Sequence, residues 1–379
     1  MSDGPGPERL AAETLQLVEV RSHTGDTVEA ARLYGSWLEE AGLDVTLRVE
    51  KFPSTPTVVA SLHGDRPGPR VVLCVHLDTV PVPHDGPARI EGSRIYGRGA
   101  ADMKGAAVCA LEAARSFAGR AFAGELAIVA IGLHEAPGGR AEDLTYLLGE
   151  GGFGADMAVV CELSSHDVAV AHMGQATAEI TITRPGSPSH ELQTPAGTPH
   201  PVVAAAKVID AVSARSDELA AVEHPWVGAE TYFVGEVHGG DFYNRFPATC
   251  TIVGTRRWAP GNSLTAVERE YRALLDAVAA ESGCTIDLDL RLVRDAYEIG
   301  LDEPLVQALR ETYVEVTGQA LEPVGIKVVA DGAIFHQAGI PTVYHGPGGV
   351  GAHADVEYVE VAELERATAV YVALLEKLL

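Results

Sequence analysis

The chain has 379 residues, is 46% hydrophobic and carries a formal net charge of −25. This length is too great for one compact core and favours two domains. Nucleic acids and anionic membranes are recognised by basic surfaces, so the acidity argues against both as partners. No run approaches the roughly 20 apolar residues that a membrane span requires.

The cysteines and the N-terminus indicate a cytoplasmic protein. Five cysteines are scattered along the chain without CxxC spacing, which is typical of reduced, mostly buried side chains. The first residues lack the basic and apolar segments of a secretion signal. We therefore expect the chain to remain in the cytoplasm.

The first part of the chain predicts helices alternating with apolar strands. Helices are expected over 7–20, 27–41, 106–117 and 144–148, and strands over 44–48, 57–62, 70–76, 125–131 and 158–161. Continuous apolar strands between helices indicate an α/β fold with a mixed or parallel sheet covered on both faces.

The pattern changes near Gln175. Residues 176–183 alternate between polar and apolar side chains, which predicts a half-exposed strand. The following elements are expected as a helix over 200–212, a strand over 248–257, a helix over 263–282 and a strand over 285–293. The α/β pattern resumes after about Asp295, with helices over 303–317 and 361–379 and a strand over 342–344. We therefore expect one domain, 1–176 with 295–379, interrupted by a smaller α+β domain, 177–294.

The apolar strand 71–76 ends in the sequence His76-Leu77-Asp78. Alternate residues of a strand face the same side, so both polar side chains lie at its C-terminal tip. Open α/β sheets bind ligands at that edge. The pair suits a metal-binding imidazole whose ring is oriented by a carboxylate. A turn histidine with a capping aspartate is the alternative, and it is favoured for this motif taken alone.

Four further segments place a metal-ligand type of side chain at the end of a strand or in a glycine-rich loop. They carry Asp102 in YGRGAADMKG, His134 and Glu135 after strand 126–131, Glu162 after strand 158–161, and His353 in GPGGVGAHAD. Each segment is weak evidence alone, because a turn or a helix cap explains it equally well. Their repetition predicts a metal centre.

Five segments in a fixed order along the chain together form a pattern that is specific for one protein family. They are HLDTVP, YGRGAADMKG, the strand followed by HEA, the strand-tip glutamate and the GPG…HAD segment. The chain resembles the dinuclear zinc family of aminoacylases, acetylornithine deacetylases, succinyl-diaminopimelate desuccinylases and carboxypeptidase G. The resemblance spans nearly the whole chain. It implies a zinc-peptidase-like mixed sheet sandwiched by helices, with an inserted α+β lid that often serves dimerisation.

The resemblance also implies the roles of the metal-site residues. His76, Asp102 and Glu162 would hold one Zn²⁺, while Asp102, Glu135 and His353 would hold the other, and Asp78 would orient His76. Oxygen and imidazole ligands suit zinc, with Co²⁺ or Mn²⁺ as alternatives. Two such ions can activate a water molecule and polarise an amide carbonyl.

Substrate-binding residues are implied in the same way. His190 resembles the lid histidine that reaches a neighbouring subunit's site and stabilises the oxyanion, so a homodimer is expected. Asn244 and Arg257 resemble contacts to the substrate carboxylate, for which a forked guanidinium is apt. Gly348 lies in the glycine-rich substrate-binding segment. A surface turn and a strand-end charge are the alternatives for His190 and Arg257.

The chain departs from the family beside the third motif. Family members carry a glutamate general base followed by a Glu or Asp ligand, whereas this chain has His134-Glu135. His134 therefore replaces the base if Glu135 is the ligand. Shifting the register by one residue would make Glu135 the base and leave Ala136 in place of a ligand. The first register is preferred because it keeps every ligand and the usual length of the loop.

These observations predict a metal-dependent amidohydrolase. Its expected substrate is a small carboxylated amino-acid derivative with an N-acyl or peptide-like amide. Family members often carry hydroxyl residues before the aspartate that corresponds to Asp331, whereas this chain has Val329-Ala330, which indicates a changed specificity. Because the glutamate base is missing, two alternatives remain open: acyl transfer, condensation or cyclisation on the same scaffold, and a catalytically silent metal-binding protein.

Overall fold

The computed structural model describes residues 6–81, 86–135, 137–162 and 166–379. It divides into two compact units. The first comprises the chain up to Val170 together with 299–324 and 331–379, and the second comprises 171–298 and 325–330. These limits differ by a few residues from the expected ones, and the short return of 325–330 to the second unit was not predicted. No helix of the described ranges is long and apolar enough to cross a membrane.

The first unit is built on a mixed sheet in the order β1-β2-β6-β3-β7-β19-β8, with β18 also paired to β8. Its strands are β1 (Asp44–Arg48), β2 (Thr57–His63), β3 (Arg66–His76), β6 (Ala123–Ile131), β7 (Met157–Val160), β8 (Asp167–His172), β18 (Glu322–Ile326) and β19 (Thr342–Tyr344). A small second sheet has the order β20-β5-β4, from β4 (Arg89–Glu91), β5 (Arg94–Tyr96) and β20 (Tyr358–Glu360).

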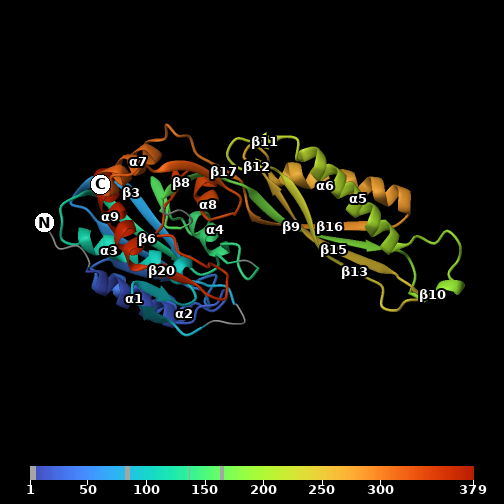
Figure 1. Cartoon of the computed structure of the whole chain (residues 1–379), viewed down its shortest axis with the longest axis horizontal. Coiled ribbons are helices and arrows are strands. Elements are labelled where there is room, and N and C mark those ends of the chain that lie inside the picture. Colours follow the sequence, from blue (N-terminus) through green and yellow to red (C-terminus); the bar gives the residue numbers. More distant parts are fainter. Residues whose placement is uncertain (1–5, 82–85, 136, 163–165) are drawn as a thin grey trace. The chain divides into compact units, whose positions relative to one another are not determined.

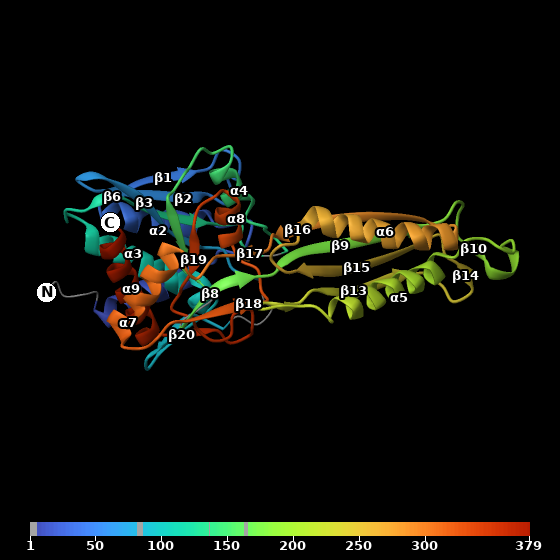
Figure 2. The same cartoon turned by 90° about the horizontal axis from the view of Figure 1, so that it is seen from above.

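Helices cover both faces of the main sheet, as Figures 1 and 2 show. One layer contains α1 (Pro7–Glu19), α2 (Val28–Glu40), α3 (Gly105–Phe117), α7 (Pro304–Thr317) and α9 (Val361–Leu378), and the other contains α4 (Glu142–Leu148) and α8 (Gly332–Gln337). The expected α/β sandwich is therefore confirmed. Both faces are covered, which explains why residues 126–131 of β6 are all fully buried.

The centre of this sheet is parallel, and this fixes the place of the site. Strand β3 runs parallel to β6 and β7, and β7 runs parallel to β19. Parallel strands end at the same edge of a sheet, so the residues that follow them meet there. His76 ends β3, His134 follows β6 and Glu162 follows β7.

The second unit is a four-stranded antiparallel sheet in the order β13-β15-β9-β16. Its elements are β9 (Gly174–Thr183), β13 (Thr231–Gly239), β15 (Thr249–Trp258), β16 (Thr285–Arg294), α5 (Pro201–Leu219), α6 (Leu264–Ser282), the short pairs β10 (Ser189–His190) with β14 (Arg245–Phe246) and β11 (Glu223–His224) with β12 (Gly228–Ala229), and β17 (Tyr297–Glu298), which pairs with the end of β8. Burial along β9 alternates at every residue, as its sequence predicted.

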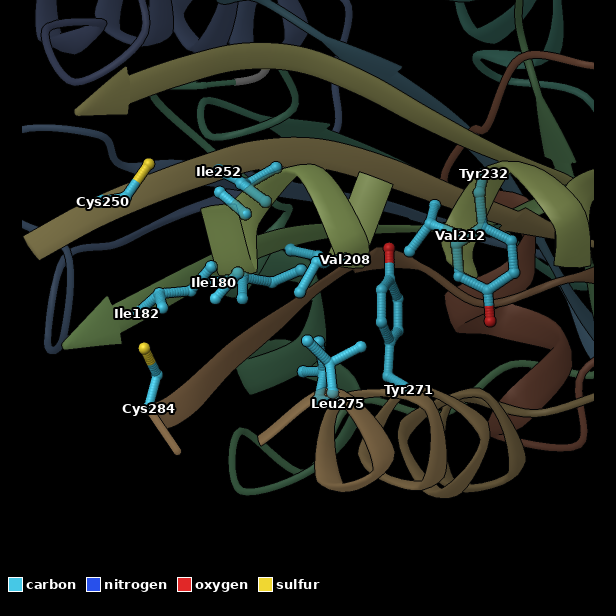
Figure 3. Close-up of a cluster of buried hydrophobic side chains, with 14 of the residues drawn as sticks. Ile180, Ile182, Val208, Val212, Tyr232, Cys250, Ile252, Tyr271, Leu275 and Cys284 are labelled. Atoms are coloured by element: carbon cyan, nitrogen blue, oxygen red, sulfur yellow. The ribbon is translucent and has the colours of Figure 1, made fainter. Parts of the chain in front are cut away.

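The core of the second unit lies between this sheet and helices α5 and α6 (Figure 3). Ile180 and Ile182 point from β9 towards Val208 of α5 and Leu275 of α6. The outward side chains of β9 are glutamine, threonine and glutamate, so one face of this strand is apolar and the other polar. This asymmetry is expected of an antiparallel sheet that is covered by helices on one side.

Candidate metal centre and active site

His76 is fully buried at the end of β3, and its two ring nitrogens face different groups. Nδ1 lies 3.0 Å from the main-chain carbonyl of Asp78, which can only accept a hydrogen bond. Nδ1 therefore carries a proton, and Nε2 lies 3.1 Å from Asp102 Oδ1, so that it donates to this carboxylate when the ring is protonated and is available to a cation when the ring is neutral. This is the arrangement in which a histidine binds a metal through Nε2.

The buried carboxylate of Asp78 organises the neighbouring loop. It accepts hydrogen bonds from the main-chain N–H groups of His134 (3.2 Å) and Glu135 (2.9 Å) and from the Thr24 hydroxyl (2.9 Å). Its Oδ1 lies 3.6 Å from His76 Nδ1, farther than the carbonyl of the same residue. The expected orienting contact to His76 thus comes mainly from the main chain of Asp78, and the carboxylate fixes the loop that carries His134 and Glu135.

Asp102 is held by a residue that the sequence did not reveal. Its loop packs against Glu357, whose Oε1 accepts hydrogen bonds from the N–H groups of Gly99, Ala101 and Asp102 at 2.9–3.0 Å. Glu357 Oε2 pairs with Arg98 at 2.5 Å. Three N–H groups converging on one carboxylate oxygen leave the loop little freedom, so the Asp102 side chain is presented in a defined position.

Asp102 lies between two histidines. Its Oδ1 faces His76, and its Oδ2 lies 3.4 Å from His353 Nε2. His353 Nε2 also lies 3.1 Å from Glu135 Oε2. Asp102 is therefore shared by a group with His76 on one side and a group with Glu135 and His353 on the other, which is the geometry of a carboxylate that bridges two cations.

The loop that carries His353 approaches the Asp102 loop closely. Gly349 has no side chain, and a Cβ at this position would collide with Ala101. His353 itself has φ +61° and is more than half exposed at its side chain, 54%. A residue other than glycine with positive φ is uncommon and concentrates at functional sites, where the surrounding structure holds it in place.

Glu162 supplies the observation that best fits a cation. It is buried, and its Oε1 has no hydrogen-bond partner among the residues that the structure describes. Its Oε2 lies 3.9 Å from His76 Nε2. Burial raises the pKa of Glu162 to about 7. An unsatisfied buried carboxylate is costly unless it is protonated or binds a cation, so the donor set fits a metal at His76, Asp102 and Glu162.

His134 is held by Asp331. Its Nδ1 lies 2.7 Å from Asp331 Oδ2, and the Asp331 side chain is almost completely buried. An ionised carboxylate only accepts hydrogen bonds, so Nδ1 carries the proton. Nε2 of neutral His134 is then an acceptor, and it lies 4.0 Å from Glu162 Oε2, beside the metal-ligand cluster.

His134 could in principle be a metal ligand itself, because one of its ring nitrogens lies within 4.8 Å of a ring nitrogen of His76 and a carboxylate oxygen of Glu162. The rings argue against this. His76 and His134 stack with centroids 4.1 Å apart and planes only 4° from parallel. A metal bound to an imidazole nitrogen lies near the plane of that ring. Two parallel stacked rings cannot both contain the same ion in their planes, so this arrangement places His134 next to the centre rather than in it.

The pKa values follow from the density of carboxylates around these histidines. Hydrogen bonds to Asp102 and Glu135 raise the pKa of His353 to about 10. Burial opposes protonation of His134, but the Asp331 carboxylate outweighs it and raises the pKa of His134 to about 9. Burial disfavours ionised Asp102, but His353 and His76 hold its pKa well below the ordinary value. The cluster thus attracts positive charge, whether as protons or as metal ions.

The residues expected in the second unit include a paired His190 and Asn244. Strands β10 and β14 bring them together, and the Asn244 side-chain amide lies 3.4 Å from His190 Nε2. His190 Nδ1 accepts a hydrogen bond from the N–H of Leu192 at 3.2 Å. Neutral His190 therefore carries its proton on Nε2, so its contact with Asn244 Nδ2, a second donor, is not a hydrogen bond. In this form Nε2 can donate to a developing negative charge.

Arg257 and Gly348 are placed separately. Arg257, near the end of β15, donates from Nη1 to the carbonyl of Lys327 at 2.8 Å, and burial lowers its pKa. In the described part of the chain its side chain pairs with this carbonyl and with no carboxylate. Gly348 lies half-buried in the loop after β19 with φ +69°, a conformation that favours glycine.

Among the described residues, the structure brings all five expected metal ligands and His134 into one cluster. Ala136, which matters to the alternative register, lies outside the described residues. Sequence reasoning missed Glu357 and the contact of Asp331 with His134. Glu357 lies four residues after His353, which is a weak sequence signal for a role near the metal ligands. The sequence drew attention to Asp331 only through the two apolar residues before it, which bear on substrate specificity.

Residues 72–377 match the family model described as Peptidase family M20/M25/M40. The chain belongs to this family. Its curated relatives include an acetylornithine deacetylase from Aliivibrio fischeri strain MJ11, 26% identical over 92% of this chain and 91% of the relative. A succinyl-diaminopimelate desuccinylase from Xanthobacter autotrophicus is 27% identical over 96% of each.

Solved structures share the fold. A tripeptidase from Staphylococcus aureus aligns with a TM-score of 0.82 at 22% identity over 98% of each chain. A dinuclear metal binding peptidase from Bacillus subtilis aligns with a TM-score of 0.74 at 16% identity, over 98% of this chain and 99% of the other. The family and the clustered ligands together make this chain a metal-dependent hydrolase of the deacylase and peptidase type.

Proposed function

We propose that the chain hydrolyses an amide bond, N-acyl or peptide-like, in a small carboxylated amino-acid derivative, with His134 as the proton acceptor. The supporting observation is the His134–Asp331 pair. It fixes an acceptor nitrogen beside a cluster whose residues suit two metal ions, at the place where the family carries a glutamate. The relatives named above act on acetylornithine and succinyl-diaminopimelate, so a small amino-acid derivative is the natural class of substrate.

Asp331 offsets the main difficulty with a histidine base, which is that nearby metal ions lower its pKa. Two cations next to His134 would lower the pKa of its ring and weaken it as an acceptor. The Asp331 carboxylate acts in the opposite direction and raises that pKa. The two influences partly cancel, which keeps the pKa of His134 nearer to neutrality, where a general base works best.

His76, Asp102 and Glu162 would hold one ion, and Asp102, Glu135 and His353 the other, most simply Zn²⁺, with Co²⁺ or Mn²⁺ as alternatives. When bound, the ions would activate water and polarise the substrate carbonyl. His134 Nε2 accepts the proton of the attacking water and delivers it to the leaving amine. His190 donates from Nε2 to the developing oxyanion, while Asn244 and Arg257 bind the substrate carboxylate and Gly348 lines the substrate.

A second candidate function is favoured by one observation, the imidazole at the position of the glutamate base. A histidine held by Asp331 could serve acyl transfer, condensation or cyclisation, in which water is not the attacking group. A silent metal-binding protein is the third reading. It is supported least, because the ligand cluster and the oriented His134 are both intact.

The test combines metal content with hydrolysis of a panel of N-acyl amino acids and dipeptides. Wild type and His134→Glu are compared, each before and after treatment with a chelator. Two metal ions per chain and chelator-sensitive hydrolysis by the wild type are expected. A wild type that binds two ions and is inert, with a hydrolytic His134→Glu variant, would replace the proposal with the second candidate function.

We further propose a homodimer formed through the second unit. Strand β13 is an edge of its sheet, and its unpaired backbone edge can pair with another strand. It exposes Phe233 (63%) and Val237 (48%), and neighbouring α5 exposes Val203 (52%). Apolar side chains along an unpaired edge suit a self-complementary twofold contact, and the family's lid histidine acts on a neighbouring subunit.

The dimer is tested by sedimentation of wild type and Val237→Asp. A charge at the edge strand is expected to shift the protein to a monomer and to lower activity without loss of bound metal. Val314→Asp on α7 is the matched control, since Val314 is equally exposed (47%) in the first unit. A wild type that sediments as a monomer at all concentrations would contradict the proposal.

The five cysteines are free and buried, which supports a reducing compartment such as the cytoplasm.

A further inference from the structure

We propose that Asp143 is a positioning residue for His134, the proposed proton acceptor. This inference rests on the proposed function and adds a further residue of the first unit to it. Asp143 lies in the first turn of α4 and is almost completely buried, with 1% of the residue exposed. It acts through the loop that joins β6 to α4 and carries His134. All of these residues belong to the same compact unit.

Two hydrogen bonds close the base of this loop. The N–H of Gly132 donates to Asp143 Oδ2 at 2.8 Å, and the N–H of Ala141 donates to the carbonyl of Leu133 at 2.6 Å. Ala141 has φ +51°, which a residue other than glycine rarely adopts unless the surrounding structure holds it. Of these two hydrogen bonds, only the one to Asp143 uses a side chain. A substitution of Asp143 therefore changes one of them and leaves the other chemically intact.

The carboxylate of Asp143 is itself held by several donors. Oδ1 accepts a hydrogen bond from the N–H of Leu144 at 3.0 Å, and Oδ2 also faces the hydroxyl of Thr57 in β2 at 3.4 Å. Burial raises the pKa of Asp143 to about 7, while the N–H groups of Gly132 and Leu144 act in the opposite direction. These donors all point at acceptor oxygens, which stabilises the ionised carboxylate. Asp143 thus links the start of the loop to α4 and to a strand of the main sheet.

Two buried carboxylates share the N–H groups that lead to the imidazole. Asp143 accepts from Gly132, and Asp78 accepts from His134 at 3.2 Å. Gly132 is also packed closely on another side, since a Cβ at this position would lie 2.4 Å from Thr27 Oγ1. The backbone that carries the ring is therefore fixed at two N–H groups that are two residues apart. Loss of the Asp143 contact releases the first of them.

The position of the His134 ring is set within narrow limits. Its Nδ1 lies 2.7 Å from Asp331 Oδ2, and its Nε2 lies 4.0 Å from Glu162 Oε2 in the metal-ligand cluster. A misplacement of a catalytic group by about 1 Å can cost on the order of 100-fold in rate. Asp143→Asn replaces one of the two acceptor oxygens by an NH₂ group, so it cannot accept from both Gly132 and Leu144. We therefore expect this variant to shift the loop and the ring.

The experiment is a double-mutant cycle on the zinc-loaded protein, with kcat, KM and metal content measured for each variant. Asp143→Asn should keep two ions and change KM by less than about twofold, while kcat falls about 10- to 100-fold. In the double variant with His134→Gln, the loss should equal that of His134→Gln alone, because Asp143 acts through His134. Losses that multiply would overturn the inference, since a purely structural contribution of Asp143 would be independent of His134.

Two further variants keep the result interpretable. Asp156→Asn is the matched control, because Asp156 Oδ2 accepts a hydrogen bond from the N–H of Arg70 at 2.7 Å, near the start of β3 and far along that strand from His76. It should leave kcat unchanged. If Asp143→Asn binds fewer than two ions, the cycle is run with Asp143→Glu, which keeps the charge and both oxygens but moves them by one methylene group. The same two outcomes then decide.

Failure of this inference can be told apart from failure of the proposed function. The Nδ1 proton of His134, which is hydrogen-bonded to Asp331, should give a downfield NMR signal that is identified by its loss in His134→Gln. Asp143→Asn should shift or broaden this signal, and Asp156→Asn should not. If the wild type hydrolyses no substrate, the proposed function fails and the NMR signal alone decides. A signal that Asp143→Asn leaves unchanged would reject the positioning role, whether or not the wild type is a hydrolase.

Discussion

The two units present their functional side chains in opposite ways. In the first unit, His76, Glu135 and Glu162 are buried, and the loop that carries Asp102 is fixed by hydrogen bonds to Glu357. In the second unit, His190 is exposed and has one main-chain hydrogen bond and one weak side-chain contact. The first arrangement is complete within the unit, while the second leaves a donor free for something outside the unit. This contrast is what the proposed metal centre, and the proposed action of His190 at the site of a partner subunit, would require.

The largest effect on the proposed metal centre is expected from a substitution of Asp102. Asp102→Asn removes the charge shared by both proposed ions, so we expect loss of at least one ion per chain and an activity loss of about a thousandfold or more. Metal analysis and steady-state kinetics measure both effects. Asp302→Asn, in the turn before α7, is a control that should change neither. An Asp102→Asn variant that retains two ions and turnover would show that Asp102 does not bridge.

Substitution of His190, unlike that of Asp102, should lower activity without loss of metal. His190→Ala removes one donor to the oxyanion, so we expect kcat to fall about 10²- to 10³-fold while metal content stays at the wild-type value. If the histidine acts across subunits, mixing His190→Ala with an inactive Asp102→Asn variant should restore part of the activity. Mixed dimers that stay inactive would contradict action across subunits.

Asp331 tests the positioning of His134 within the first unit. Asp331→Asn removes the carboxylate that orients the ring, and a fall in kcat of about 10- to 100-fold is expected with both ions retained. That carboxylate also raises the pKa of His134, so its removal lowers this pKa and moves the acid limb of the kcat profile to lower pH. An acid limb that stays in place would mean that another group titrates.

The smallest effect concerns the pH dependence of metal binding. The carboxylates raise the pKa of His353 to about 10, so this ring is protonated near neutrality and must lose its proton to bind a cation. Metal affinity should therefore rise with pH, by about tenfold per unit for each proton displaced. Competition with a chelator between pH 6 and 8 measures the slope. His353→Ala should make that slope shallower, and an unchanged slope would remove His353 from the ligands.

Sequence patterns were enough to predict much of the fold and the clustering of the expected metal ligands. Apolar strands 71–76, 126–131 and 158–160 are parallel in the structure, so residues at their ends had to converge. The alternation in β9 likewise predicted its two faces. The contacts of Glu357 with Asp102 and of Asp331 with His134 were beyond the sequence, because each joins segments far apart along the chain. The choice of main-chain over side-chain contact between Asp78 and His76 depends on local backbone geometry, which no residue pattern specifies.

The central claim is that His134 accepts the proton in an intact metal centre. Its most direct test is turnover by His134→Gln, measured together with metal content on the N-acyl amino acid that the wild type uses best. The account predicts two ions per chain and a loss of kcat of about 10²- to 10⁴-fold, because glutamine cannot accept the proton as a base. Wild-type turnover by His134→Gln with both ions bound would contradict it and would show that another residue is the base.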